Sequence, residues 1–275
     1  MKAPRPSPLA KAILTDVTRC VGCEKCVVAC EKTWNTGDTI PSAHAAPDGL
    51  SGARWTAIVK IADRFVRKQC LHCINPACLN ACPVHAFERL PEGPVIYNKD
   101  KCIGCRYCMI SCPFTIPRYE WNTPVPFVRK CKFCFERLAK GERPACTAAC
   151  PYGATIFGTR KEMLAEAQYR LAMNPRRYIQ RIWGETDYGG TSVLYISDVP
   201  LEALGFPADD AAACKKTFSA FTWPTALKTP YLGGTVLAGT AAVGWIINRR
   251  MEIAEQNRKQ HESGQSENRD SKQVK

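Results

Sequence analysis

Short runs of apolar and β-branched residues, separated by Gly, Pro, Asn and Asp, recur along the chain before residue 200. Runs with this composition and these boundaries predict short β-strands. The predicted strands cover residues 12–15, 56–61, 95–97, 154–157 and 192–196. Residues 90–94, with the sequence LPEGP, predict a hairpin turn just before the third of these strands.

One amphipathic helix is predicted to begin at Thr159. Thr159 and Glu162 have the spacing of a capping box, in which each side chain bonds the backbone N–H of the other residue. Met163, Ala167 and Leu171 share one face of this helix, and the Asn-Pro pair at 174–175 ends it. We expect the apolar face to pack on the core.

A second helical pattern lies near the C-terminus, where residues 229–248 carry no charged side chain. At about 1.5 Å per residue, such a run spans the bilayer's hydrocarbon core of roughly 30 Å. Tyr231 and Trp245 lie near its ends, where aromatic rings favour the membrane interface. We predict a transmembrane helix over residues 226–248, a connecting segment at 201–225 and a polar tail at 249–275. The alternative is a buried Gly/Ala-rich core helix.

This helix also presents small residues at Gly234, Ala238 and Ala242. Small residues at this spacing let a second helix approach closely in lipid, so we infer a membrane partner. The segment contains no histidine that could ligate haem, which makes it an anchor and a docking face.

Cysteine is the chain's unusual component, with 17 in 275 residues, and all but Cys214 fall into four sets. The first set is Cys20, Cys23, Cys26 and Cys30; the second is Cys70, Cys73, Cys78 and Cys82; the third is Cys102, Cys105, Cys108 and Cys112; the fourth is Cys131, Cys134, Cys146 and Cys150. The first and third sets read C-x2-C-x2-C-x3-C, the run in which a bacterial ferredoxin sends its fourth cysteine to the other cluster of a pair.

This spacing suits [4Fe-4S] clusters because three thiolates on one tight loop reach three corners of a cubane. Gly22 and Gly104 permit close backbone approach at those loops. Zinc ribbons use paired C-x2-C knuckles and need no third cysteine, and disulfides this dense would be strained. The pattern therefore predicts four [4Fe-4S] clusters. We expect the neighbouring sets two and three to exchange their fourth cysteines, which leaves sets one and four to pair with each other. Spacing alone also allows the pairing of set one with two and of set three with four.

The formal net charge of +13 raises the question of nucleic acid or an anionic membrane as a partner. Sixteen ligating thiolates would subtract sixteen charges, and four cores of about +2 each would return about eight, leaving about +5. The basic excess thus indicates compensation for buried clusters, and we expect no nucleic-acid partner.

No pattern predicts chemistry on a substrate: the chain has no Walker loop, dinucleotide fingerprint, nucleophile elbow or H-E-x-x-H. His72, between Cys70 and Cys73, is interpreted as a local hydrogen-bonding residue with a possible tuning role beside a cluster. His44 and His85 have no partner pattern. Residues 1–9 have no apolar stretch and no twin arginine, so we expect either a cytoplasmic protein or export with a signal-bearing partner.

Three segments carry a family resemblance: CLHCINPACLNACP, CIGCRYCMISCPFTIPRY and CKFCFERLAKGERPACTAACPYGATIFGTRKEML. Over residues 13–200 the chain resembles the four-cluster iron–sulfur subunits of membrane-bound molybdopterin oxidoreductases and some [NiFe]-hydrogenases. Four features are most similar to the β subunit of membrane-bound formate dehydrogenase. They are the short gap in the fourth set, the single C-terminal membrane helix, SGARWT at 51–56 and WPTALKTP at 223–230. GGTSVLYISDVPLEALGFP at 189–207 resembles the hydrogenase type instead.

The resemblance implies an α+β fold of two tandem bacterial-ferredoxin-like modules with insertions in residues 1–200, plus the C-terminal transmembrane helix. It also implies a nested set of ligands. Cys20, Cys23, Cys26 and Cys150 would hold the cluster nearest the catalytic subunit; Cys30, Cys131, Cys134 and Cys146 the next; Cys70, Cys73, Cys78 and Cys112 the third; and Cys82, Cys102, Cys105 and Cys108 the one nearest the membrane haem subunit.

The function implied is a non-catalytic electron relay between a molybdopterin (Mo/W) subunit of the formate dehydrogenase kind and a cytochrome b-type or quinone-reactive subunit in the lipid membrane. Alternatives are the same relay in a [NiFe]-hydrogenase or another molybdopterin oxidoreductase, electron flow from quinol to a reductase, and a basic nucleic-acid protein with structural clusters. Lys215, Lys216 and Lys228 precede the helix and Arg249, Arg250, Arg258 and Lys259 follow it, which slightly favours a cytoplasmic C-terminus. The resemblance implies the same single-pass orientation in a bacterial inner membrane, with the cluster domain periplasmic.

Overall fold

The computed structural model describes residues 7, 9–36, 47–120, 127–207, 231–256 and 258. The chain divides into two compact units, Met1–Phe221 and Thr222–Lys275, which are treated separately below. His44, Cys214, the connecting segment from residue 208, the WPTALKTP segment and the tail beyond residue 258 lie outside the described residues.

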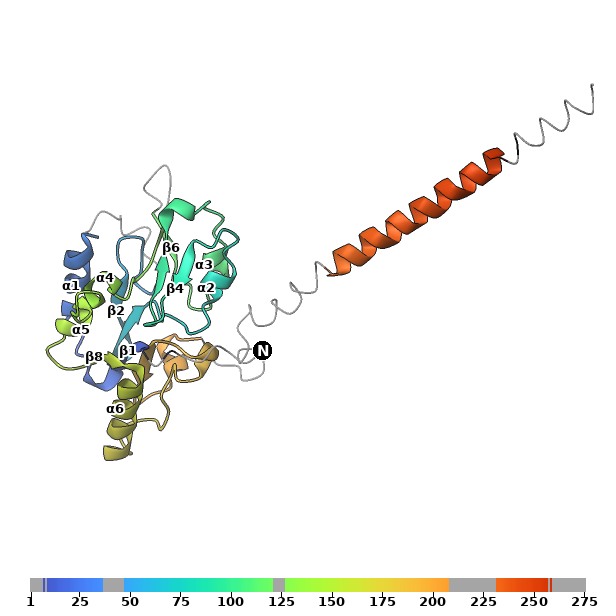
Figure 1. The fold of residues 1–275 in the computed structure, drawn as a ribbon. Coiled ribbons are helices and arrows are strands. Elements are labelled where there is room, and N and C mark those ends of the chain that lie inside the picture. The colour runs from blue at the N-terminus through green and yellow to red at the C-terminus, as the bar shows by residue number, and fades with distance from the viewer. Residues whose placement is uncertain are drawn as a thin grey trace, which may run out of the picture. The chain divides into compact units, whose positions relative to one another are not determined.

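A three-stranded sheet forms the centre of the first unit (Figure 1). Its middle strand β1 (Lys11–Asp16) pairs antiparallel with β8 (Thr155–Thr159) and parallel with β9 (Val193–Ile196). All four residues of β9 are buried, as are five of the six in β1. Segments from both ends of the domain therefore meet at one strand.

The two faces of β1 have different neighbours because side chains alternate along a strand. Ala12 and Leu14 pack against helix α6 (Arg160–Met173) in an apolar cluster. Ile13 belongs instead to the cluster that contains Cys26 and Cys146. The strand thus separates a purely apolar layer from the side of the domain that carries cysteines.

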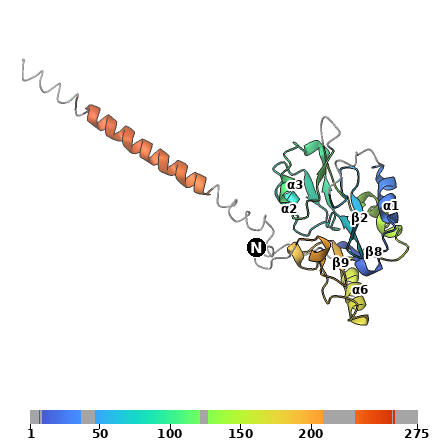
Figure 2. The ribbon, with the colours of Figure 1, turned by 180° about the vertical axis from the view of Figure 1, so that it is seen from behind.

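Helix α6 confirms the predicted capping box. The Thr159 hydroxyl accepts a hydrogen bond from the Glu162 N–H at 3.2 Å, and the Glu162 carboxylate accepts one from the Thr159 N–H at 2.8 Å. The predicted apolar face is buried against the sheet, and Asn174 caps the end of the helix. Figure 2 shows α6 lying along β8 and β9 from the opposite side.

Three two-stranded hairpins surround the central sheet. They are formed by β2 (Thr56–Ile61) with β3 (Arg64–Gln69), β4 (Phe87–Arg89) with β5 (Val95–Tyr97), and β6 (Arg118–Tyr119) with β7 (Val128–Arg129). The five predicted strands are confirmed to within a residue or two at their ends, and the turn at 90–94 joins β4 to β5. Strand β3 was not predicted, since its sequence RFVRKQ is mostly polar.

The cysteines lie on or beside five short helices, α1 (Lys25–Trp34), α2 (Ala77–Asn80), α3 (Tyr107–Ser111), α4 (Phe135–Leu138) and α5 (Ala145–Ala148). Helix α1 packs against α5, and α2 packs against α3. Figure 1 shows α1, α4 and α5 on one side of the unit and α2 and α3 on the other. Among the described residues, 3-10 turns lie at Val17–Arg19, Lys99–Lys101, Asp187–Gly189 and Leu201–Leu204. This mixture of short helices and small sheets confirms the α+β fold.

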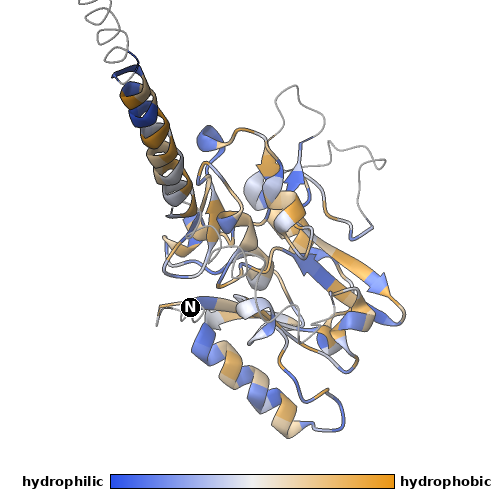
Figure 3. Ribbon diagram, turned by 90° about the vertical axis from the view of Figure 1, so that its right-hand side faces the viewer, coloured by the Kyte–Doolittle hydropathy of each residue, from blue (hydrophilic) through white to orange (hydrophobic). Residues whose placement is uncertain are grey.

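The second unit contains one described helix, Tyr231–Gln256, of 26 residues. It is long and apolar enough to cross a membrane, and each of its described residues is exposed. Figure 3 shows apolar residues through its middle and hydrophilic residues toward its C-terminal end. The helix continues beyond the predicted membrane-spanning stretch that ends at residue 248, and Arg249 and Arg250 are part of it.

Candidate iron–sulfur cluster sites

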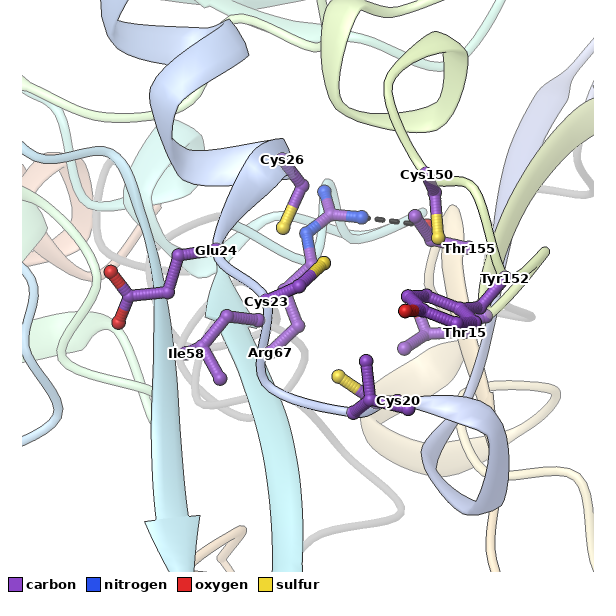
Figure 4. Close-up of a pocket in the computed structure, with 12 residues that line it drawn as sticks. Thr15, Cys20, Cys23, Glu24, Cys26, Ile58, Arg67, Cys150, Tyr152 and Thr155 are labelled. Atoms are coloured by element: carbon purple, nitrogen blue, oxygen red, sulfur yellow. Dashed lines mark hydrogen bonds between the residues drawn. The ribbon is translucent and has the colours of Figure 1, made fainter.

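Four cysteines from the two ends of the domain line one cavity, the first thiol site (Figure 4). Cys20 and Cys23 come from the loop that leads into α1, Cys26 lies in the first turn of α1, and Cys150 follows α5. Their sulfur atoms surround a common space, with the Arg67 guanidinium at its inner wall. The first and fourth sets of the sequence therefore meet here.

A second cavity, the second thiol site, is lined by Cys30, Cys131, Cys134 and Cys146. It adjoins the first because two helices serve both sites. Cys26 and Cys30 are one turn apart on α1, and Cys146 and Cys150 are likewise four residues apart at α5. Close packing of α1 on α5 thus places two thiol sites side by side.

The remaining cysteines form the third and fourth thiol sites where α2 packs on α3. Cys73 lies near Cys70, Cys78 and Cys112, whose charges add to burial in raising the pKa of its thiol. Burial, followed by the charges of Cys102, Cys105 and Cys82, raises the pKa of Cys108 to about 12. The structure therefore brings members of the second set beside members of the third.

Positive backbone φ angles shape the two C-x2-C-x2-C loops in the same way. Gly22 and Gly104 have φ of +73° and +71°, and the residues just before the helices, Glu24 and Arg106, have φ of 55° and 63°. These left-handed residues turn the loop around the space where the thiols converge. The Gly104 N–H also points at Cys102 Sγ, at 3.4 Å.

Further backbone amides face cysteine sulfurs elsewhere. The Phe133 N–H donates to Cys131 Sγ at 3.3 Å, and the Ala86 N–H donates to Cys82 Sγ at 3.2 Å. At the first thiol site the Gly22 N–H lowers the pKa of the Cys20 thiol and offsets part of the rise caused by burial. Amide donors of this kind stabilise thiolates rather than thiols.

Burial opposes ionisation of these thiols when nothing positive lies between them. It is the largest cause that raises the pKa of Cys26 to about 11 and of Cys112 to about 11. Neighbouring thiolates raise these pKa values further, so four thiolates in one buried space need cations among them. A [4Fe-4S] core supplies those cations, and four convergent thiols match its four irons. The donor sets therefore fit such clusters.

Arg67 on β3 is a site residue that the sequence did not reveal. It is 2% exposed and lines both the first and the second cavity. Its Nη2 donates to Cys146 Sγ at 3.1 Å. Because β3 also carries Arg64 and Lys68, which of its basic side chains points inward depends on the strand register, and no sequence signal identifies it.

His72 is fully buried and makes the local hydrogen bond expected of it. Its Nδ1 accepts the Val95 N–H at 3.0 Å, which places the imidazole proton on Nε2. Burial and then the charge of Lys130 hold the pKa of His72 well below its ordinary value, so it stays neutral. Its ring also packs against that of Phe133, with the two centroids 4.8 Å apart.

The first and fourth thiol sites each contain an exposed cysteine, whereas the cysteines of the second and third sites are buried or half-buried. Cys23 and Cys105 are exposed. Large apolar side chains stand exposed around them: Val21, Val28 and Tyr152 near the first site, and Ile103, Tyr107 and Ile110 near the fourth. The row of sites is thus open at both ends.

Comparison with known proteins agrees with this geometry. Residues 61–160 match the family model described as a 4Fe-4S dicluster domain. The nitrate-inducible formate dehydrogenase iron–sulfur subunit of Escherichia coli K12 is 36% identical over 237 residues, which cover 79% of this chain and 78% of that protein. The chain belongs to this family of iron–sulfur subunits.

Other relatives of this iron–sulfur subunit carry two kinds of name. The formate dehydrogenase iron–sulfur subunit of Haemophilus influenzae is 35% identical over 264 residues, covering 86% of this chain and 82% of that protein. The hydrogenase-2 operon protein HybA of Escherichia coli O157:H7 is 36% identical over 247 residues, covering 74% and 75%. The family resemblance is confirmed, and [4Fe-4S] clusters are the cofactor of the family domain.

Proposed function

We propose that this chain is the electron-relay subunit of a membrane-bound, formate dehydrogenase-like oxidoreductase and that it holds four [4Fe-4S] clusters. The ligands we assign are Cys20, Cys23, Cys26 and Cys150 for the first; Cys30, Cys131, Cys134 and Cys146 for the second; Cys70, Cys73, Cys78 and Cys112 for the third; and Cys82, Cys102, Cys105 and Cys108 for the fourth. Each such cluster takes up and returns one electron.

The observation that carries this proposal is the unbroken row of thiol sites. Helices α1 and α5 join the first site to the second. Cys131 of the second lies near Cys70 of the third, whose charge raises the pKa of the Cys131 thiol after burial and the nearer thiols. Cys78 of the third lies near Cys108 of the fourth, and both belong to one buried cluster. A row of this kind suits the transfer of electrons over a distance rather than the conversion of a substrate at one site.

The exposed ends of the row are the proposed docking places for two partners. A molybdopterin subunit would deliver electrons at the first site, and a cytochrome b-type or quinone-reactive subunit would receive them at the fourth. Formate oxidation to CO2 releases two electrons and one proton, and quinone takes two electrons and two protons to become quinol. The chain passes those electrons singly and needs no catalytic side chain of its own.

The names of the relatives point to two alternative electron-donating partners. Formate dehydrogenase subunits favour formate chemistry, and HybA favours the same relay beside a nickel–iron hydrogenase as the second candidate. Because relatives of both kinds align over most of the chain, the same arrangement of clusters would serve either candidate electron donor.

The helix Tyr231–Gln256 is the proposed membrane anchor. Its small residues Gly234, Ala238 and Ala242 would face a helix of the membrane partner. Arg249 and Arg250 follow the apolar run, which favours a cytoplasmic C-terminus and a periplasmic cluster domain in a bacterial inner membrane. Export would then depend on a signal-bearing catalytic partner.

Replacing Cys105 with Ala tests the relay. We expect iron to fall from about 16 to about 12 atoms per chain, because one of four clusters is lost. Electron transfer from substrate to quinone should fall to background, while reduction of a soluble dye by the catalytic subunit persists. Both are measured on the complex purified in mild detergent.

Cys214→Ala is the matched control, since Cys214 belongs to none of the four sets. It should keep full iron and full quinone reduction. Full-rate quinone reduction by the Cys105→Ala complex, with its iron lowered, would show that the relay is not linear.

A further inference from the structure

The Arg67 side chain lies between the first and second thiol sites and lines both cavities. Its Nε donates to the Thr56 hydroxyl at 3.2 Å, and its Nη1 donates to the Thr155 hydroxyl at 2.6 Å. Figure 4 shows the guanidinium among the sulfurs of Cys23, Cys26 and Cys150, with its bond to Thr155. Strands β2 and β8 therefore fix the position of this charge.

No carboxylate pairs with Arg67 among the residues that the structure describes. Its remaining contacts are Gln69 Oε1 and Cys146 Sγ, both from Nη2. A buried charge without an ionic partner is costly, whereas arginine keeps its proton throughout the physiological range. The groups that can balance this charge are thus the thiolates of the two adjoining sites.

Gln69 extends the arrangement toward the second site. Its Oε1 accepts the bond from Arg67, which turns the Nε2 amide nitrogen the other way. Gln69 is 2% exposed and lines the second cavity, and Nε2 has no hydrogen-bond partner within the described residues. Buried amide donors are almost always satisfied, so this N–H points to an acceptor that belongs in the cavity.

We infer that Arg67, steadied by Gln69, is a positioning residue that sets the reduction potentials of the first and second clusters. The inference rests on the proposed function. Reduction adds one electron, and hence one negative charge, to a cluster without a proton transfer at arginine. A fixed positive charge beside the cluster stabilises the reduced form more than the oxidised form, which raises its potential.

The test compares three variants of the full complex by redox titration followed by EPR, together with iron analysis. Arg67→Gln removes the charge, and Arg67→Lys keeps it. Lys68→Gln is the matched control, because Lys68 is the next residue on β3 and points away, donating to the Leu204 and Gly205 carbonyls at 2.8 and 3.1 Å. It removes the same charge on the opposite face of the strand.

We expect Arg67→Gln to shift two of the four potentials downward and Arg67→Lys to restore most of that shift. Lys68→Gln should leave all four near the native values. Loss of two EPR signals in Arg67→Gln, with all four retained in Arg67→Lys, would show that the charge is needed for cluster assembly and would overturn the inference about potentials.

The inference is overturned if Arg67→Gln keeps all four clusters at native potentials, or if the Gln and Lys variants behave alike. An iron content of the native protein below that of four clusters would instead count against the proposed function. The two failures are therefore distinguishable in one series.

Discussion

Gly22 and Gly104 occupy the same place in two equivalent loops, yet their surroundings differ. Both have positive φ, where a side chain is strained. A Cβ on Gly22 would lie 2.5 Å from Cδ1 of Phe65, whereas a Cβ on Gly104 would meet no atom within 4 Å. The pair separates backbone strain from steric crowding.

We predict that Gly104→Ala costs about 1 kcal/mol, from backbone strain alone. Gly22→Ala should cost about 1–3 kcal/mol more, because the Phe65 ring must move. For a domain of this size these costs lower the melting temperature by about 2–4 °C per kcal/mol. Thermal unfolding of the two cluster-loaded variants, followed by visible absorbance, measures the difference. Equal shifts would mean that the Phe65 ring yields without cost.

At the residue scale, the sequence predicts those residues whose spacing along the chain is what cluster ligation requires. The sixteen cysteines and two loop glycines are predicted from their intervals alone, because a cubane demands fixed intervals between ligands, and the role of the cysteines as ligands stays a prediction. Arg67 and Gln69 could not be identified, since their role depends on which face of β3 turns inward and on what packs against it. Those facts arise only when distant strands assemble.

Strand β1 shows at the element scale how the fold isolates the thiol sites. Its residues at 13 and 15 line the second and first cavities, while Ala12 and Leu14 contact α6. Helix α6 therefore supports the sheet from the face opposite the cysteines. A change in α6 should affect stability without affecting the clusters.

Replacing Thr159 with Ala removes the hydroxyl that accepts the Glu162 N–H. Loss of such a cap costs about 1 kcal/mol, so the melting temperature should fall by about 2–4 °C. Iron content and reduction potentials should stay native. Thr159→Ser keeps the hydroxyl and serves as the control; a loss of iron in Thr159→Ala but not in Thr159→Ser would show that α6 does reach the clusters.

Elements with a clear local pattern could be predicted, and those without one could not. The capped helix and five strands have their signals in adjacent residues. Helices α2, α4 and α5 have four residues each, too few for a helical period. Their prediction needed the tertiary structure.

On the scale of the whole molecule, the proposed relay has four thiol sites in a row with both ends exposed, which is what a component working between two partners needs. Relatives named as subunits of formate dehydrogenase align with this chain over most of its length, and so does one named for a hydrogenase-2 operon. The metal of the catalytic partner is therefore the feature that distinguishes the two candidate functions.

We expect the native complex, captured through this chain in mild detergent, to contain molybdenum or tungsten with an excess of iron. Elemental analysis measures all of these in one sample. Nickel without molybdenum or tungsten would assign the chain to a hydrogenase and leave the ligand sets unchanged. In the expected case, formate is the first substrate to test.

The proposed assignment of ligands also determines the order in which the ligand sets are completed during translation. Once Cys112 has left the ribosome, every ligand of the third and fourth sites has been made, but the first and second sites wait for Cys146 and Cys150. Their earlier cysteines, from Cys20 to Cys30, remain incomplete ligand sets while the intervening chain is translated. We expect the third and fourth clusters to be the first that can be filled, and the first and second clusters to complete the domain before it joins its partners.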